Sequence, residues 1–238
     1  MKPKHLHAAI VVLSLLAVGT QPALGTKYIP GDLSIGTWDS GNNIYTLTTD
    51  VYETIQIDED NLTLDGAGYT VTAGSSLDGV YVPTRTGVTI QNVNVQGCYI
   101  GIYVYSGSGN TLTNNTASNN LNAIHSDYSS NINVTNNTAS SNGAGIWLHN
   151  SSNSVVTANT ALDNYGGGIY LYLSDDCTVQ DNTAFDNNVV VSLWTAHNNT
   201  VTGNTISSNK VGAAIWCSND NLTCSPMAKL TNSESNAC

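Results

Sequence analysis

Short runs in which apolar and polar residues alternate fill most of this chain. Examples are Ile102-Tyr103-Val104, Ile146-Trp147-Leu148 and Ile169-Tyr170-Leu171. Alternation with a period of two residues predicts a strand that buries one of its faces. Asn, Asp, Gly and Ser fill the gaps between the runs, and these residues favour tight turns. The pattern therefore predicts an all-β chain built from many short strands.

An internal repeat organises these runs and decides the fold. The motif Asn-Thr-Ala/Ile-x-x-Asn occurs five times, at intervals of 22 or 23 residues. Each interval holds three short extended pieces, which are too closely spaced to pair as hairpins in a flat sheet. They can form one triangular coil, and stacked coils place equivalent residues about 4.8 Å apart. We therefore predict a right-handed parallel β-helix of about eight coils, with roughly 22 residues and three strands per coil.

The two Asn positions of the motif are expected to form two ladders along this solenoid. The first ladder contains Asn115, Asn137, Asn159, Asn182 and Asn204. The second ladder contains Asn120, Asn142, Asn164, Asn187 and Asn209. Stacked side-chain amides hydrogen-bond to the amides above and below them. We therefore assign these Asn residues a structural role rather than a catalytic one.

The composition divides the chain into four parts. Residues 1–25 combine a short basic start, an apolar run and a small-residue cleavage pattern that ends at Gly25, which together predict a secretory signal peptide. Residues 26–50 are expected to form a β-rich N-terminal cap, residues 51–224 the β-helix and residues 225–238 a C-terminal tail. No second long apolar run occurs, so we expect no membrane span. The expected location is extracellular, in the cell envelope.

Charge and titratable residues exclude several functions. The chain has 6 Lys and Arg against 17 Asp and Glu, a net charge of −11, so we expect no nucleic-acid partner. Such a protein also repels polyuronates. His125, His149 and His197 do not share a column of the repeat or a familiar ligand spacing, so no metal site and no cofactor are expected. We expect no catalytic residues.

The outward positions of one sheet are rich in aromatic residues. If the Ile of each alternating run points inward, its polar or aromatic neighbours point outward. The aromatic members of this predicted face are Tyr103, Trp147, Tyr170, Tyr172, Trp194 and Trp216. A large aromatic patch is typical of a protein interface or of a platform on which sugars stack. The sequence leaves these two alternatives open.

Five cysteines follow the predicted signal peptide, and export permits disulfides. The cross-link candidates are Cys98, Cys177, Cys217, Cys224 and Cys238. An odd number leaves at least one thiol free or paired between chains. Cys238 is the preferred intermolecular candidate because it ends the predicted tail, whereas Cys177 also suits a buried, reduced thiol.

A family resemblance rests on the run from Leu62 to Val71 and on the repeated Asn-Thr and Gly-Ile units. This run resembles the first coil of NosD-like parallel β-helix proteins, which are exported by bacteria and by methanogenic archaea. The resemblance implies the fold and is compatible with a surface or sheath protein of the archaeal type. It implies little about activity, because the fold hosts enzymes, adhesins and envelope proteins.

Two functions are expected from these observations. The first is a secreted structural protein that assembles with itself, and with other envelope proteins or glycans, into a sheath or surface layer. This interpretation relies on open strand edges, an aromatic face and intermolecular disulfides. The alternative is an extracellular β-helix protein that binds or acts on carbohydrate through the same aromatic face. The first is preferred on the sequence.

Overall fold

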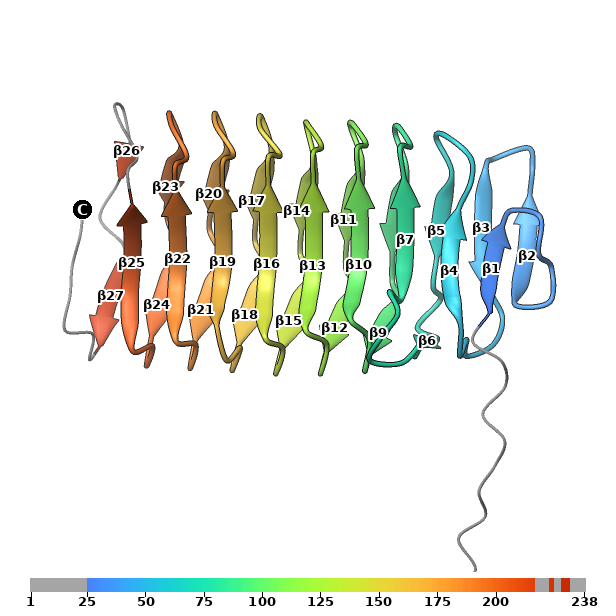
Figure 1. Cartoon of the computed structure of the whole chain (residues 1–238), viewed down its shortest axis with the longest axis horizontal. Helices are drawn as coiled ribbons and strands as arrows, with labels where there is room; N and C mark the ends of the chain where they lie inside the picture. Colours follow the sequence, from blue (N-terminus) through green and yellow to red (C-terminus); the bar gives the residue numbers. More distant parts are fainter. Residues whose placement is uncertain (1–24, 217–222, 225–227, 232–238) are drawn as a thin grey trace, which may run out of the picture.

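A computed structural model describes residues 25–216, 223–224 and 228–231, and describes side chains as far as residue 211. The described residues form strands and turns without a helix, wound into a parallel solenoid of about seven turns (Figure 1). The predicted parallel β-helix is therefore confirmed, and the number of turns is close to the eight expected. No helix in the described part is long and apolar enough to cross a membrane.

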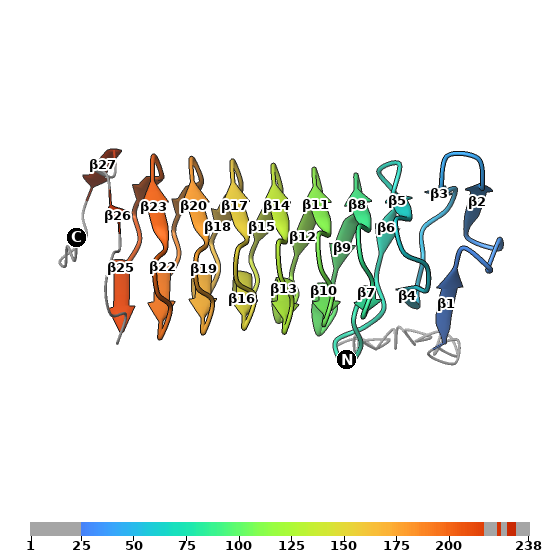
Figure 2. The same cartoon turned by 90° about the horizontal axis from the view of Figure 1, so that it is seen from above.

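Three sheets run along the solenoid, and each coil of the repeat contributes one strand to each of them (Figure 2). Sheet A contains β1 (Thr26–Ile29), β4 (Thr54–Ile57), β7 (Val80–Pro83), β10 (Ile100–Tyr105), β13 (Asn122–Asp127), β16 (Ala144–His149), β19 (Gly167–Tyr172), β22 (Val189–Trp194) and β25 (Val211–Trp216). Sheet B contains β2 (Gly36–Asp39), β3 (Ile44–Leu47), β5 (Thr63–Asp65), β8 (Thr89–Gln91), β11 (Thr111–Thr113), β14 (Asn133–Thr135), β17 (Val155–Thr157), β20 (Thr178–Gln180), β23 (Thr200–Thr202) and β26 (Thr223–Cys224). Sheet C contains β6 (Thr70–Val71), β9 (Asn94–Gln96), β12 (Thr116–Ser118), β15 (Thr138–Ser140), β18 (Thr160–Leu162), β21 (Thr183–Phe185), β24 (Thr205–Ser207) and β27 (Ala228–Thr231).

The sequence repeat sets the register between coils. In sheet A, Ile102 pairs with Ile124 and Ile124 pairs with Ile146, so equivalent residues of the repeat lie side by side. Their side chains are fully buried inside the coil. Sheet C contributes small residues, and the stacked Ala117 and Ala139 form with Ala123 a second cluster of buried residues. Because a shift of one residue would turn each apolar set outward, burial fixes this register.

Both Asn ladders lie at corners of the coil with their side chains buried. Asn137 donates from its side-chain amide to Oδ1 of Asn159 at 3.0 Å and to the carbonyl oxygen of Leu112 at 2.8 Å. The backbone N–H of Asn137 donates to the same Oδ1 at 2.8 Å. In the second ladder, Asn142 donates to Oδ1 of Asn164 at 3.0 Å. Each amide thus satisfies backbone groups that the turn leaves without a strand partner, which is a structural task.

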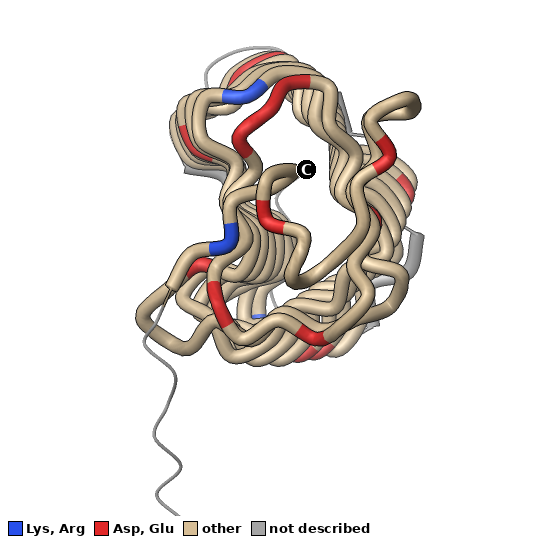
Figure 3. The backbone as a smooth tube through the Cα atoms, turned by 90° about the vertical axis from the view of Figure 1, so that its right-hand side faces the viewer, with Lys and Arg blue, Asp and Glu red and all other residues tan. Residues whose placement is uncertain are grey.

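The N-terminal end of the coil is covered, although no helix covers it. There β2 pairs antiparallel with β3, so sheet B does not end in a parallel edge that could template a further coil. The fully buried Tyr45 points into the end of the core, where its hydroxyl donates to the carbonyl oxygen of Asp32, and Trp38 packs against the same core. Figure 3 views the coil from this end. The edge of sheet B at this end is therefore β2, an antiparallel strand, rather than a parallel strand of the coil.

The segment assigned to the N-terminal cap also takes part in the coil. β1 pairs in parallel with β4 in sheet A, and β3 pairs in parallel with β5 in sheet B. The first turn of the solenoid therefore begins within residues 26–50. Of the predicted signal peptide, residues 1–25, only Gly25 lies within the described residues. Most of the predicted tail also lies outside them.

Candidate functional site

The outward face of sheet A carries a continuous stack of rings. Its first outward column contains Tyr81, Tyr103, His125, Trp147 and Tyr170, one from each of five successive strands. Successive ring centres are 5.4, 5.4, 5.3 and 5.5 Å apart. The repeat places them one coil apart, so the aromatic contacts follow from the register. All five side chains are half-buried on this face.

The second outward column lies two residues further along the same strands. It contains Tyr105, Asp127, His149, Tyr172 and Trp194. The rings of His149 and Tyr172 are 4.9 Å apart, and those of Tyr172 and Trp194 are 6.1 Å apart. Trp194 is 51% exposed, although it is the largest side chain of the column. An exposed indole on a flat sheet is a surface that a ligand can cover.

Two grooves lie on this face of sheet A. The first has a volume of about 380 Å³, and its walls include Leu121, Trp147, Tyr170 and Trp194. The second has a volume of about 430 Å³, and its walls include Asp78, Leu121 and Trp147. Because Leu121 and Trp147 line both grooves, the two hollows adjoin. Small residues at the start of the strands, such as Gly143, leave the space that forms the first groove.

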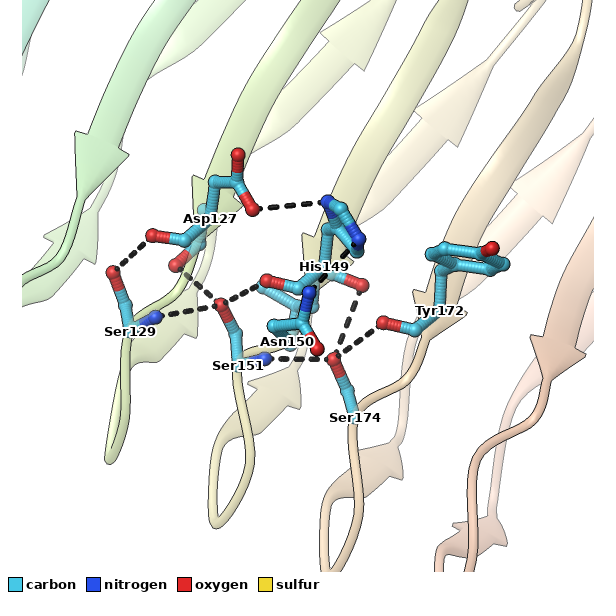
Figure 4. Close-up of polar contacts among 9 residues, drawn as sticks. Asp127, Ser129, His149, Asn150, Ser151, Tyr172 and Ser174 are labelled. Atoms are coloured by element: carbon cyan, nitrogen blue, oxygen red, sulfur yellow. Dashed lines mark hydrogen bonds and ion pairs between the residues drawn. The ribbon is translucent and has the colours of Figure 1, made fainter.

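A polar cluster interrupts the aromatic face at β13 and β16. His125 and Asp127 are two residues apart on β13, and His149 lies beside Asp127 on β16. Nδ1 of His149 lies 2.9 Å from Oδ1 of Asp127 (Figure 4). One potential ligand atom from each of the three residues lies within 4.8 Å of the other two. Neither ring nitrogen of His125 has a hydrogen-bond partner, although both are buried.

Electrostatics keep the His125 ring neutral near pH 7. Burial between Tyr103 and Trp147 lowers its pKa, Asp127 opposes this shift and His149 adds to it, which together bring the pKa to about 4. Burial disfavours the charged imidazolium form because the rings around it cannot solvate the charge. A neutral imidazole has one nitrogen with a free lone pair.

A ladder of serines holds the ends of these strands in place. The hydroxyl of Ser129 donates to the carbonyl oxygen of Asp127 at 2.9 Å, and the hydroxyl of Ser151 donates to that of His149 at 2.9 Å (Figure 4). The backbone N–H of Ser151 in turn donates to the hydroxyl of Ser174 at 2.9 Å. Hydrogen bonds from this ladder therefore hold the backbone at Asp127 and His149, which preorganises their side chains.

The sequence predicted the aromatic face but missed the polar cluster and the serine ladder. The cluster is hard to see in the sequence because its members belong to two adjacent outward columns. His125 belongs to the first column, and Asp127 and His149 belong to the second. One signal was present, since Asp127 and His149 are one repeat of 22 residues apart. Trp216 is in register with Trp194, and its side chain is not described.

Among the described residues, Asp78 and Asp127 do not fit a glycosidase pair on this face. Asp78 precedes β7 at the start of the strands, whereas Asp127 ends β13. The register places them five residues apart along the strand direction, which corresponds to about 16 Å. Glycosidase carboxylates lie about 5–9.5 Å apart. Asp175 instead accepts a hydrogen bond from the backbone N–H of His197 at 2.7 Å, which is a role in a turn.

Two of the five cross-link candidates must be corrected. Cys98 and Cys177 are free thiols whose side chains are buried, so they cannot reach another chain. They occupy core positions because a thiol packs as a small apolar group. Cys217 and Cys238 lie outside the described residues, and only the backbone of Cys224 is described. Cross-linking through these three stays a prediction.

We expect Cys177 to react with a thiol reagent at pH 8 at least ~100-fold more slowly in the folded protein than in denaturant. Burial raises the pKa of its thiol to about 11, so the thiolate is scarce at this pH, and access is blocked as well. Mass spectrometry of labelled peptides measures the rate at this position. Equal rates in the folded and denatured protein would contradict the buried placement.

Comparisons with known proteins agree on the architecture. A sequence model described as a right-handed β-helix region matches residues 78–226. A DFA-IIIase from Arthrobacter chlorophenolicus A6 in complex with GF2 aligns with a TM-score of 0.58 and 15% identity, over 78% of this chain and 57% of that one. The same enzyme without its lid gives a TM-score of 0.51 and 14% identity, over 73% and 47%.

Endopolygalacturonase I from Stereum purpureum aligns with a TM-score of 0.47 and 18% identity, over 75% of this chain and 68% of that one. Because the alignment covers 57% of the DFA-IIIase, this chain spans little more than half the length of that enzyme. Comparison with curated proteins gives no match. At such identities the solved structures show a shared fold alone. The family match covers more than half of the sequence, and it agrees with the parallel register of all three sheets, so this chain belongs to the family of right-handed β-helix proteins.

Proposed function

We propose that this protein is secreted and binds a neutral oligosaccharide along the aromatic face of sheet A. The observation that carries the proposal is the groove walled by Trp147, Tyr170 and Trp194, in which the indole of Trp194 is 51% exposed. The apolar face of a sugar ring packs on an aromatic ring, and its hydroxyls take hydrogen bonds at the edge. This was the alternative interpretation of the sequence, and the site now favours it.

The charge of the protein supports a neutral ligand rather than an anionic one. Among residues 25–211 the cationic side chains are Lys27, Arg85 and Lys210 (Figure 3). Lys27 contacts Asp32 and Glu53, and Arg85 contacts Asp58. None of the three cations lines either groove of the aromatic face. At either groove a uronate chain would therefore meet no cationic side chain of residues 25–211, on a protein of net charge −11.

A glycan array with neutral and acidic oligosaccharides tests the proposal, followed by titration of the intrinsic tryptophan fluorescence with the best ligand. We expect neutral glycans to bind and Trp194→Ala to weaken binding at least ~10-fold, because this substitution removes the exposed stacking surface. Trp38→Phe is the matched control, since Trp38 packs at the covered end of the core, and its affinity should equal that of the wild type. Binding that is unaffected by Trp194→Ala, or that is confined to acidic glycans, would contradict the proposal.

Self-assembly into an envelope layer stays a less supported prediction. Two of its three premises have weakened, because Cys98 and Cys177 are buried and sheet B ends in an antiparallel strand. The third premise, the aromatic face, is shared with the glycan proposal. Light scattering with and without reductant separates the two, since only a disulfide-linked layer should shrink on reduction.

A further inference from the structure

We propose that His125, Asp127 and His149 form a binding site for a divalent transition metal ion of the Zn²⁺ class. One nitrogen from each imidazole and one carboxylate oxygen lie within 4.8 Å of each other on the outward face of β13 and β16. A shared ion at about 2.0–2.2 Å from each ligand atom requires these atoms to lie closer together than ~4.4 Å. A modest rotation of the side chains achieves this, and the backbone can stay in place.

The unpartnered state of His125 argues for a missing ligand. Both of its ring nitrogens are buried, and neither has a hydrogen-bond partner among the described residues. A buried polar atom without a partner loses its hydrogen bonds to water and gains none in return, so such an atom in a folded protein calls for an explanation. A column of stacked rings alone would accept Tyr or Trp here, as at Tyr103 and Trp147 on either side. A metal ion would give one nitrogen of His125 the partner that it lacks.

The surroundings of His149 allow its Nδ1 to become a ligand without loss of charge balance. Nδ1 of His149 lies 2.9 Å from Oδ1 of Asp127, and Nε2 lies 3.0 Å from the side-chain nitrogen of Asn150. With a metal ion on Nδ1, the neutral ring carries its proton on Nε2. A flip of the Asn150 amide then presents its carbonyl oxygen to this proton, so that the ring stays neutral and doubly partnered.

The donor set selects the class of ion. Two imidazoles and one carboxylate suit Zn²⁺ and neighbouring transition metals, whereas Ca²⁺ and Mg²⁺ prefer sites made of oxygen atoms. Three protein ligands leave a fourth coordination position for water or a further ligand. The rings of Trp147 and Tyr172 pack against His125 and His149. The inference rests on the cluster and is independent of glycan binding.

Isothermal titration of the EDTA-treated protein with Zn²⁺ tests this site, with Ca²⁺ as the contrasting ion. We expect one Zn²⁺ site per chain that Asp127→Asn and His149→Gln each weaken at least ~10-fold. The matched controls are Asp163→Asn and His197→Gln, which change the same residue types outside the cluster and should keep the wild-type affinity. Circular dichroism and melting temperature establish that each variant is folded, and Asp127→Asn preserves the shape of the side chain.

A second readout uses Co²⁺, whose visible absorption reports nitrogen and oxygen ligands directly. We expect a d–d band that His149→Gln removes and His197→Gln retains. Equal Zn²⁺ affinity in the wild type and in Asp127→Asn would overturn the site, as would binding of Ca²⁺ in place of Zn²⁺. Titration of the protein with the glycan in the presence of EDTA separates the two proposals. Glycan binding in EDTA depends on the aromatic face alone, whereas Zn²⁺ binding without glycan depends on the cluster alone.

Discussion

Replacing Asn159 with alanine is expected to lower the free energy of unfolding by about 2–5 kcal/mol. Asn159 donates to the carbonyl oxygen of Val134 at 2.8 Å and accepts from the backbone N–H of Asn137 at 2.8 Å. All of these groups are buried. Alanine leaves the carbonyl and the N–H without partners in a place that water does not reach, and each such group costs about 1–3 kcal/mol. Urea denaturation followed by circular dichroism measures the change.

The matched control is Asn188→Ala. Asn188 is exposed in the turn before β22, and the hydrogen bonds found for it involve its backbone rather than its side chain. We expect this substitution to change stability by less than ~0.5 kcal/mol, as is usual on a surface. If Asn159→Ala lowered the free energy of unfolding no more than Asn188→Ala, water or a neighbouring amide would be able to replace the hydrogen bonds of Asn159.

The ladders could be predicted because the same residue type recurs at a fixed spacing. Asn159 and Asn182 occupy the same place in successive copies of one motif, and stacking follows from the period. The serine ladder has the same geometry but no such signal. Its positions hold Gly107, Ser129, Ser151 and Ser174 in successive coils, and Ser is common in every turn of this chain. A turn accepts several small residues, so the residue type at this position varies from coil to coil. The backbone N–H at the position still donates to the serine hydroxyl of the next coil.

The candidate site also has a part that the sequence predicts, the aromatic face, and a part that it does not, the polar cluster. Alternation along the strand fixes which side chains point outward, so the aromatic face was predictable residue by residue from Tyr103 to Trp194. Contacts between neighbouring columns were harder to see. His125 and Asp127 share a strand, and Asp127 and His149 share a column, so only the two relations together define the cluster. The covered end of the coil escaped prediction for another reason, because β2 runs antiparallel outside the repeat.

Replacing Tyr45 with alanine is expected to destabilise the protein by about 3–5 kcal/mol and to promote its self-association. Tyr45 is fully buried, pairs with Leu64 in sheet B and begins the inward column of that sheet. Its hydroxyl holds the loop at Asp32 across the end of the core. Alanine opens a cavity there and releases the loop, so the first coil loses the cover over its apolar interior. An uncovered end of a parallel sheet is a template for another chain.

Chemical denaturation and light scattering measure the two effects in the same samples. Tyr52→Ala is the matched control, because Tyr52 is 61% exposed in the same region, and this variant should behave as the wild type. Tyr45→Phe separates the two contributions, since it keeps the ring and removes the hydroxyl, and it should cost about 1 kcal/mol without association. A Tyr45→Ala variant that stays as monodisperse as Tyr52→Ala would contradict the expected self-association. The N-terminal cover would then stabilise the fold without preventing association, and the antiparallel pairing of β2 would be what prevents it.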